Sequence, residues 1–201
     1  MLRYPRYSAG FTLVEVLIAV VIMAILAAVM IPNDSSDLND VLLSTAQIIA
    51  NDLAYGRSLA VVNNDRYCFT FNLKTNSYTL QHSGANTTLN ILPVTAFTNP
   101  TDPPIQHIVN LSTFPCAQSG CGMPVSLAAV QTTSGTTVTS ITQVEFNSYG
   151  QTTQAAATSI WLSIGTGSSL RYIPLFINAV TGLTTIGPFS GYGPPTPSNG
   201  N

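Results

Sequence analysis

The chain opens with a long apolar segment. From Phe11 to Ile31, only Thr12 and Glu15 interrupt a continuous run of apolar residues. A run of about 20 such residues is long enough for a helix to cross a bilayer. Pro32 then ends or kinks the helix, because proline has no backbone N–H to donate. The pattern predicts a membrane-spanning helix over residues 11–32.

A second helical pattern follows, and it has one apolar face. From Leu38 onward, apolar residues recur three or four positions apart, as far as Leu59 and Ala60. The polar residues between them lie largely off this face. The spacing predicts an amphipathic helix within residues 33–64 that lays its apolar face on a sheet. Gly56 is a weak point in this helix, because glycine is a poor helix former.

Alternation with a period of two replaces the helical spacing after residue 65. Residues 66–73 place alternate aromatic and apolar side chains on one face, and residues 78–82 return after a polar turn. Further strands are expected at 89–97, 105–111, 138–146, 159–164, 170–178 and 183–186. Pro174 restricts its strand to an edge or a bulge. The predicted fold class is α+β, with a long N-terminal helix packed on an antiparallel sheet.

Composition limits the kind of protein that this can be. Charged residues make up only 7% of the 201 residues, against roughly 25% in an average soluble protein. Uncharged polar residues carry the solubility instead, which suits an extracytoplasmic, β-rich surface. The hydrophobic fraction of 45% excludes a disordered chain.

The start of the apolar segment combines a small residue with an acid. Gly10 gives a protease close access to the backbone, and a cut after it would create a charged amine on Phe11. Glu15 lies about one helical turn further on, where an ionised carboxylate in lipid needs a cationic partner. Helices packed side by side could pair the amine of one chain with Glu15 of its neighbour. Such a pair would fix the register of assembly.

The sequence Gly-Phe-Thr-Leu-Val-Glu at residues 10–15, preceded by Arg3 and Arg6, resembles the class III signal of the type IV pilin family. In that family a prepilin peptidase cuts after the glycine and methylates the new terminus. The resemblance implies cleavage between Gly10 and Phe11, N-methylation of Phe11, and an assembly contact at Glu15.

Two other interpretations of the apolar segment compete with this one. A secretory signal is cut after its apolar region, where Ala24 and Ala27-Ala28 offer only weak sites. A plain membrane anchor does not explain an acid placed four residues after a Gly-Phe junction.

Three later segments resemble the GspH/FimT-like minor pseudopilins and minor pilins: residues 53–61, residues 144–150, and residues 172–177 together with Thr181-Gly182. The resemblance implies a minor pilin or pseudopilin that assembles through its N-terminal helix into a type IV pilus or a type II secretion pseudopilus. The implied partners are the prepilin peptidase, other pilin or pseudopilin subunits and the bacterial inner membrane, with the globular domain in the periplasm. The alternatives are a major structural pilin, a DNA-receptor minor pilin of natural transformation, and an anchored binding domain that does not assemble.

These patterns divide the chain into five parts. They are a prepilin leader peptide at 1–10, a transmembrane or filament-core helix at 11–32, an amphipathic helix at 33–64, a β-rich globular domain at 65–190 and a flexible tail at 191–201.

Charge disfavours a nucleic-acid partner. Removal of residues 1–10 takes away two of the six basic residues and leaves four against eight acidic ones, a side-chain charge of −4. Neutralisation of phosphates by basic side chains supplies most non-specific DNA affinity. The DNA-binding relatives carry a basic stretch near the C-terminal turn, whereas residues 181–187 contain no basic residue here.

The chain has three cysteines and no recognisable catalytic motif. Cys116 and Cys121 are close enough in sequence to close a small disulfide loop outside the cytoplasm. Cys68 is expected to be a packed side chain, although a bridge from Cys68 to either of the others stays open. A Cys-x4-Cys pair with His107 is a poor zinc signature. No nucleophile elbow, phosphate loop or dinucleotide fingerprint is present, so we expect no enzymatic activity, cofactor or metal.

Overall fold

The computed structural model describes residues 12–29, 34–94, 99–114 and 124–198. The chain divides into two compact units, Met1–Asp34 and Ser35–Asn201. The first unit contains helix α1 (Leu13–Val29), and the second contains helix α2 (Asp34–Val62) apart from its first residue. Within the described ranges, neither helix combines the length and the apolar character needed to cross a membrane.

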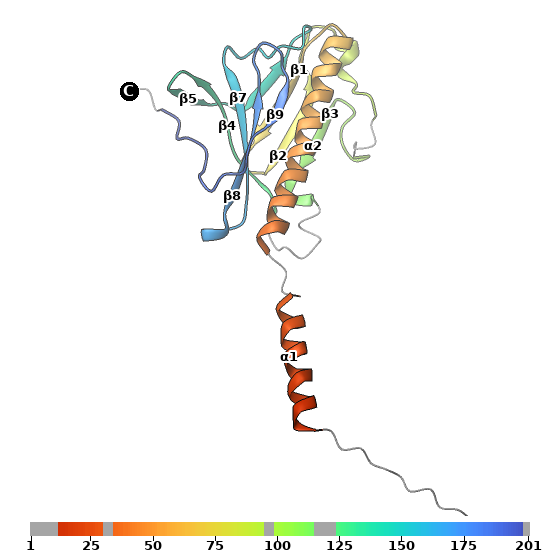
Figure 1. Cartoon of the computed structure of the whole chain (residues 1–201). Helices are drawn as coiled ribbons and strands as arrows, with labels where there is room; N and C mark the ends of the chain where they lie inside the picture. The colour runs from red at the N-terminus through yellow and green to blue at the C-terminus, as the bar shows by residue number, and fades with distance from the viewer. Residues whose placement is uncertain (1–11, 30–33, 95–98, 115–123, 199–201) are drawn as a thin grey trace, which may run out of the picture. The chain divides into compact units, whose positions relative to one another are not determined.

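The second unit holds two antiparallel sheets (Figure 1). Sheet A has the order β3-β2-β1-β6, and sheet B has the order β5-β4-β7-β8-β9. The strands of sheet A are β1 (Tyr67–Asn72), β2 (Ser77–His82), β3 (Gln106–Asn110) and β6 (Gln143–Phe146). Those of sheet B are β4 (Ser126–Ser134), β5 (Thr137–Ser140), β7 (Ala157–Ile164), β8 (Arg171–Ile177) and β9 (Thr184–Ile186). In the described part of the chain, three short 3-10 helices lie between strands: η1 (Thr87–Asn90), η2 (Leu111–Thr113) and η4 (Gly167–Ser169).

Helix α2 buries the apolar face that the sequence predicts. Its fully buried side chains recur at helical spacing, and they include Leu42, Ile49 and Leu53. Gly56 lies on the same face. A Cβ atom on it would come 2.4 Å from the ring of Phe69 in β1, so the absence of a side chain lets the helix approach sheet A.

The hairpin predicted at residues 66–82 is confirmed as β1 and β2, with Phe69 opposite Leu80. Asn76 in its turn adopts a left-handed conformation, with φ of 51°. The side chain of Asn76 donates to the carbonyl of Val125 (2.7 Å) and accepts from the N–H of Leu127 (2.8 Å). The turn of sheet A is thereby tied to the start of β4 in sheet B.

The structure corrects three features of the predicted sheet. Residues 138–146 form two strands in different sheets, because the chain crosses from sheet B to sheet A between them. The N–H of Ile141 still donates to the carbonyl of Val130 in sheet B, whereas the carbonyl of Thr142 accepts the N–H of Phe71 in sheet A. Residues 89–94 contain the end of η1 and no strand, and residues 95–98 lie outside the described part. Strand β4, which the sequence did not indicate, lies between β5 and β7 in sheet B.

The α+β prediction is confirmed, with a helix packed on two antiparallel sheets in place of one. Buried side chains from α2 and both sheets form a single cluster, which contains the neighbouring aromatic rings of Phe69, Phe71, Tyr78 and Phe146.

Within the segment predicted to be a flexible tail, Ser198 donates its N–H to Val138 (3.0 Å) and accepts the Val138 N–H on its hydroxyl (3.2 Å).

Candidate functional site

Helix α1 begins with a cap that involves Glu15. The carbonyl of Thr12 accepts the N–H groups of Glu15 (3.1 Å) and Val16 (3.3 Å), and the Thr12 hydroxyl also accepts from the Glu15 N–H (3.3 Å). Thr12 and Glu15 have the spacing of a capping box, in which an N-cap threonine and a glutamate three residues later support the first turn. A carboxylate in this turn also interacts favourably with the helix dipole. The Glu15 carboxylate therefore lies where it can support the first turn of α1.

The described side chains of α1, from Leu13 to Leu26, are exposed on every face of the helix. Its large apolar residues between Leu13 and Leu26 are 48 to 81% exposed within the described chain. A helix that is apolar all round is stable only when something covers it, because exposed apolar area costs free energy in water. The unit that contains α1 thus presents a surface that needs an apolar partner.

Four predicted site residues lie outside the described residues. Gly10 and Phe11, the predicted cleavage and methylation positions, are among them. So are Cys116 and Cys121, whose disulfide stays a prediction. Cys68 is buried in β1, as expected, and it has no disulfide partner among the described residues; burial raises the pKa of its thiol.

The three segments that resemble the GspH/FimT-like group meet in space. Arg57 near the end of α2 donates from its Nε atom to the carbonyls of Gly150 (3.1 Å) and Thr181 (2.9 Å). A Cβ atom on Gly182, whose φ is +65°, would come 1.9 Å from the carbonyl oxygen of Gly150. The residues that the sequence marks as a scattered signature therefore form one packed contact between α2 and two loops.

A cluster of polar side chains surrounds the buried His82 near the start of sheet A. The imidazole of His82 is fully buried and contacts Asp65 (3.1 Å) and Asn90 (2.8 Å) through its two ring nitrogens. Asp65 also accepts the N–H groups of Asn86 and Arg66. The Asn86 N–H is the main reason that the pKa of Asp65 is lowered. These contacts hold the chain around the ends of β1 and β2 together, and no nucleophile joins them.

A second buried pair links α2 to β2. The phenol of Tyr78 donates to the carboxylate of Asp52. Burial raises the pKa of both groups, and the neighbouring Asp52 charge raises that of Tyr78 further. His107 is close enough to act on Asp52 through its charge. In the part of the chain that the structure describes, no three His, Cys, Asp or Glu side chains gather as metal ligands would.

Comparison with known proteins finds one family that matches the N-terminal segment. Residues 5–31 match the family described as the prokaryotic N-terminal methylation motif. No curated protein sequence matches the chain.

Two crystal structures of the type IV minor pilin FimU from Pseudomonas aeruginosa are similar in fold. One shares 15% identity over 73% of this chain and 93% of that chain, with a TM-score of 0.40. The other shares 12% identity over 75% of this chain and 90% of that chain, with a TM-score of 0.41.

The matched residues include the apolar helix and the acid at its start. The chain therefore carries the prokaryotic N-terminal methylation motif at residues 5–31.

Proposed function

We propose that the chain is a minor pilin or pseudopilin, which assembles through its N-terminal helix into a type IV pilus or a type II secretion pseudopilus. The observation that carries this proposal is the all-round exposed apolar surface of α1 within a methylation motif. Neighbouring copies of such a helix would cover one another in a filament core. Before assembly, the segment would sit in the bacterial inner membrane with the globular unit in the periplasm.

Processing would prepare the helix for this contact. In the proposal, prepilin peptidase cuts between Gly10 and Phe11 and methylates the new amine of Phe11. The cationic terminus of one subunit then pairs with Glu15 of a neighbour. Glu15 suits this role because its side chain is exposed and its hydrogen bonds to Thr12 use only its backbone N–H. In an apolar filament core few other partners compete for either charge.

The basic side chains of the globular unit disfavour the DNA-receptor alternative. Arg57 is engaged by two carbonyls, and Arg171 donates to the carbonyls of Ser168 and Leu170. Arg66 lies 3.7 Å from Glu145. A surface with so few available cations gains little from releasing counterions of DNA. A major pilin remains the alternative within the same class, and it would dominate sheared filaments.

The test separates the charge of Glu15 from its capping role. Glu15→Gln keeps the capping box, since glutamine also serves at that position, but removes the charge. In the native host we expect this variant to begin at methylated Phe11 by intact mass, yet to be missing from the sheared filament fraction. Asp40→Asn, at an exposed acid of α2, should be processed and assembled normally.

Two outcomes would contradict the proposal. A mature chain that still begins at Met1 would remove the prepilin pathway. A Glu15→Gln chain that enters filaments as well as the wild type would leave Glu15 with only its capping role.

A further inference from the structure

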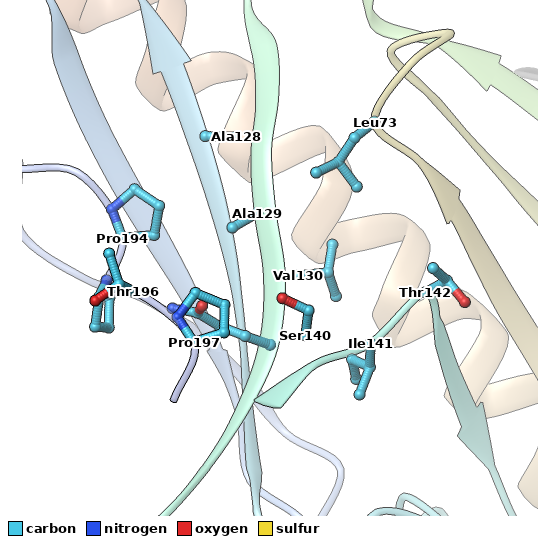
Figure 2. A pocket seen from close by; sticks show the side chains of 12 residues that line it. Leu73, Ala128, Ala129, Val130, Ser140, Ile141, Thr142, Pro194, Thr196 and Pro197 are labelled. Atoms are coloured by element: carbon cyan, nitrogen blue, oxygen red, sulfur yellow. The ribbon is translucent and has the colours of Figure 1, made fainter. Parts of the chain in front are cut away.

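A cavity of about 360 Å³ lies against β4, on the sheet B side of the globular unit (Figure 2). Its volume falls within the range of about 300–1,000 Å³ that is typical of ligand sites. Most of its lining is apolar, and none of the lining residues carries a charge. Figure 2 shows Pro194, Thr196 and Pro197 on the side of β4 to which Ala129 points, with Val130 and Ile141 on the other.

Gln131 also lines this cavity, and its side-chain amide has no partner. The residue is fully buried, and neither Nε2 nor Oε1 has a hydrogen-bond partner among the described residues. Successive side chains of a strand point to opposite faces, so Gln131 shares the face of Ala129 and lies opposite Val130 of the core. A buried carboxamide without partners costs about 1–3 kcal/mol for each unsatisfied group, so the site is suited to a group that can pair with both atoms.

The segment that covers Gln131 cannot supply those partners well. Three of the four residues 194–197 are prolines, which have no N–H to offer Oε1. Within the described chain, residues 193–197 make no hydrogen bond to either sheet, and the tail is held at Ser190, which pairs with Tyr172, and at Ser198, which pairs with Val138. The cover can therefore move between two fixed points without breaking hydrogen bonds of its own.

We propose that this cavity binds an uncharged peptide segment of a partner chain in extended conformation. One residue of an extended chain presents its N–H and its C=O on the same side, and these two groups complement the Oε1 and Nε2 atoms of Gln131. The apolar lining accepts an uncharged side chain of the same segment, and the uncharged lining gives no partner to an ionic ligand. This inference stands apart from the proposed assembly role, because every residue that it uses lies in the globular unit.

Trp161 provides a reporter for this site. It is the one tryptophan of the chain, and it lies opposite Ala129 in the register of β7 and β4. Directly opposed residues share a face of the sheet, so the indole lies on the same face of sheet B as Ala129, which lines the cavity. The experiment titrates the full-length protein in neutral detergent micelles with N-acetyl-Gly-Leu-Gly-N-methylamide. Binding is followed by Trp161 fluorescence and by calorimetry.

We expect saturable binding to the wild type and to Gln47→Leu, which changes an exposed glutamine of α2. Gln131→Leu should bind at least about tenfold more weakly, since two hydrogen bonds are lost. A peptide whose leucine N–H is methylated should show a similar loss with the wild type.

That analogue requires no variant, so the test stands even if Gln131→Leu fails to fold. Equal affinity for the two peptides, equal affinity of the two glutamine variants, or no saturable binding would each overturn the proposal. In the last case, a bound water molecule would be the better partner for Gln131.

Discussion

Arg57 is the residue that joins the most distant parts of the sequence. Its Nε atom bonds to carbonyls 93 and 124 residues away along the chain. The sequence marks Arg57, Gly150 and Gly182 only as members of three separate segments. What they bind could not be predicted, because hydrogen bonds between loops depend on the tertiary arrangement and leave no periodic signal.

Arg57→Ala should destabilise the globular unit by about 2 kcal/mol, since hydrogen bonds from a charged group each contribute roughly 1.5–3 kcal/mol. Urea unfolding followed by Trp161 fluorescence measures this loss. Arg66→Ala is the matched control. Arg66 is about half exposed and forms a long ion pair with Glu145, so its loss should cost less than about 1 kcal/mol. Equal losses for the two variants would contradict the role given to Arg57.

Asp52 makes stability depend on pH in a defined direction. Its carboxyl pKa is raised above 3.8, mainly by burial. The folded state therefore holds this proton more tightly than the unfolded state does. The resulting stabilisation is fully present below pH 3.8 and is lost as the pH rises through the raised pKa.

Asp52→Asn keeps an oxygen to accept from Tyr78 and removes the buried charge. We expect the variant to gain stability relative to the wild type as the pH rises from below 3.8 to neutral. Urea unfolding at a series of pH values measures the difference in free energy. A difference that stays constant with pH would show that the Asp52 charge is not the cause.

Helices and strands whose apolar residues recur at a clear helical or strand spacing could be predicted from the sequence, and those without such a spacing could not. Helix α2 and the β1–β2 hairpin follow from the spacing of apolar residues. Strand β4 was missed because the apolar residues near its start, such as Ala128 and Ala129, are small, and a bulge between Leu127 and Ala129 breaks its alternation. Pro174 lies in β8 between β7 and β9, and it is tolerated there because it sits beyond the paired residues of β9.

Gly56 reverses an expectation based on helix propensity. In an exposed helix, replacement of glycine by alanine adds about 1 kcal/mol of stability. Here the new methyl group would lie 2.4 Å from the Phe69 ring and 3.2 Å from Leu80. We expect Gly56→Ala to destabilise the fold by about 1–3 kcal/mol, because the core has no room for it.

The measurement for this variant is the thermal unfolding midpoint. Ala54→Gly, at an exposed position of the same helix, is the control and should lose about 1 kcal/mol through propensity alone. A Gly56→Ala chain that is more stable than the wild type would show that α2 can move away from sheet A.

For the whole molecule, the sequence indicates the N-terminal motif that the family match at residues 5–31 also covers, but it does not indicate the arrangement of the sheets. The Gly-Phe junction and Glu15 stand out because polar groups are rare in an apolar run, and the processing and pairing assigned to them stay predictions. The division into two sheets depends on the crossing at Ile141 and Thr142, where two backbone hydrogen bonds join the chain to different sheets. The cavity at Gln131 was likewise unpredictable, since residues about 60 positions apart in the chain line it.

The buried core should stabilise the second unit alone, without a contribution from α1. Every member of the buried core cluster lies between Leu42 and Ile177, and none belongs to α1. A chain that begins at Ser35 should therefore fold, with the same urea midpoint as the full-length protein in the same detergent. A chain that begins at Leu43 is the control. It also loses Leu42, which is fully buried, and should be less stable by about 2–5 kcal/mol. If removal of residues 1–34 alone lowered the midpoint as much, α1 would contribute to the stability of the globular unit. Equal midpoints would leave the apolar surface of α1 free for contacts outside its own chain, as assembly through this helix requires.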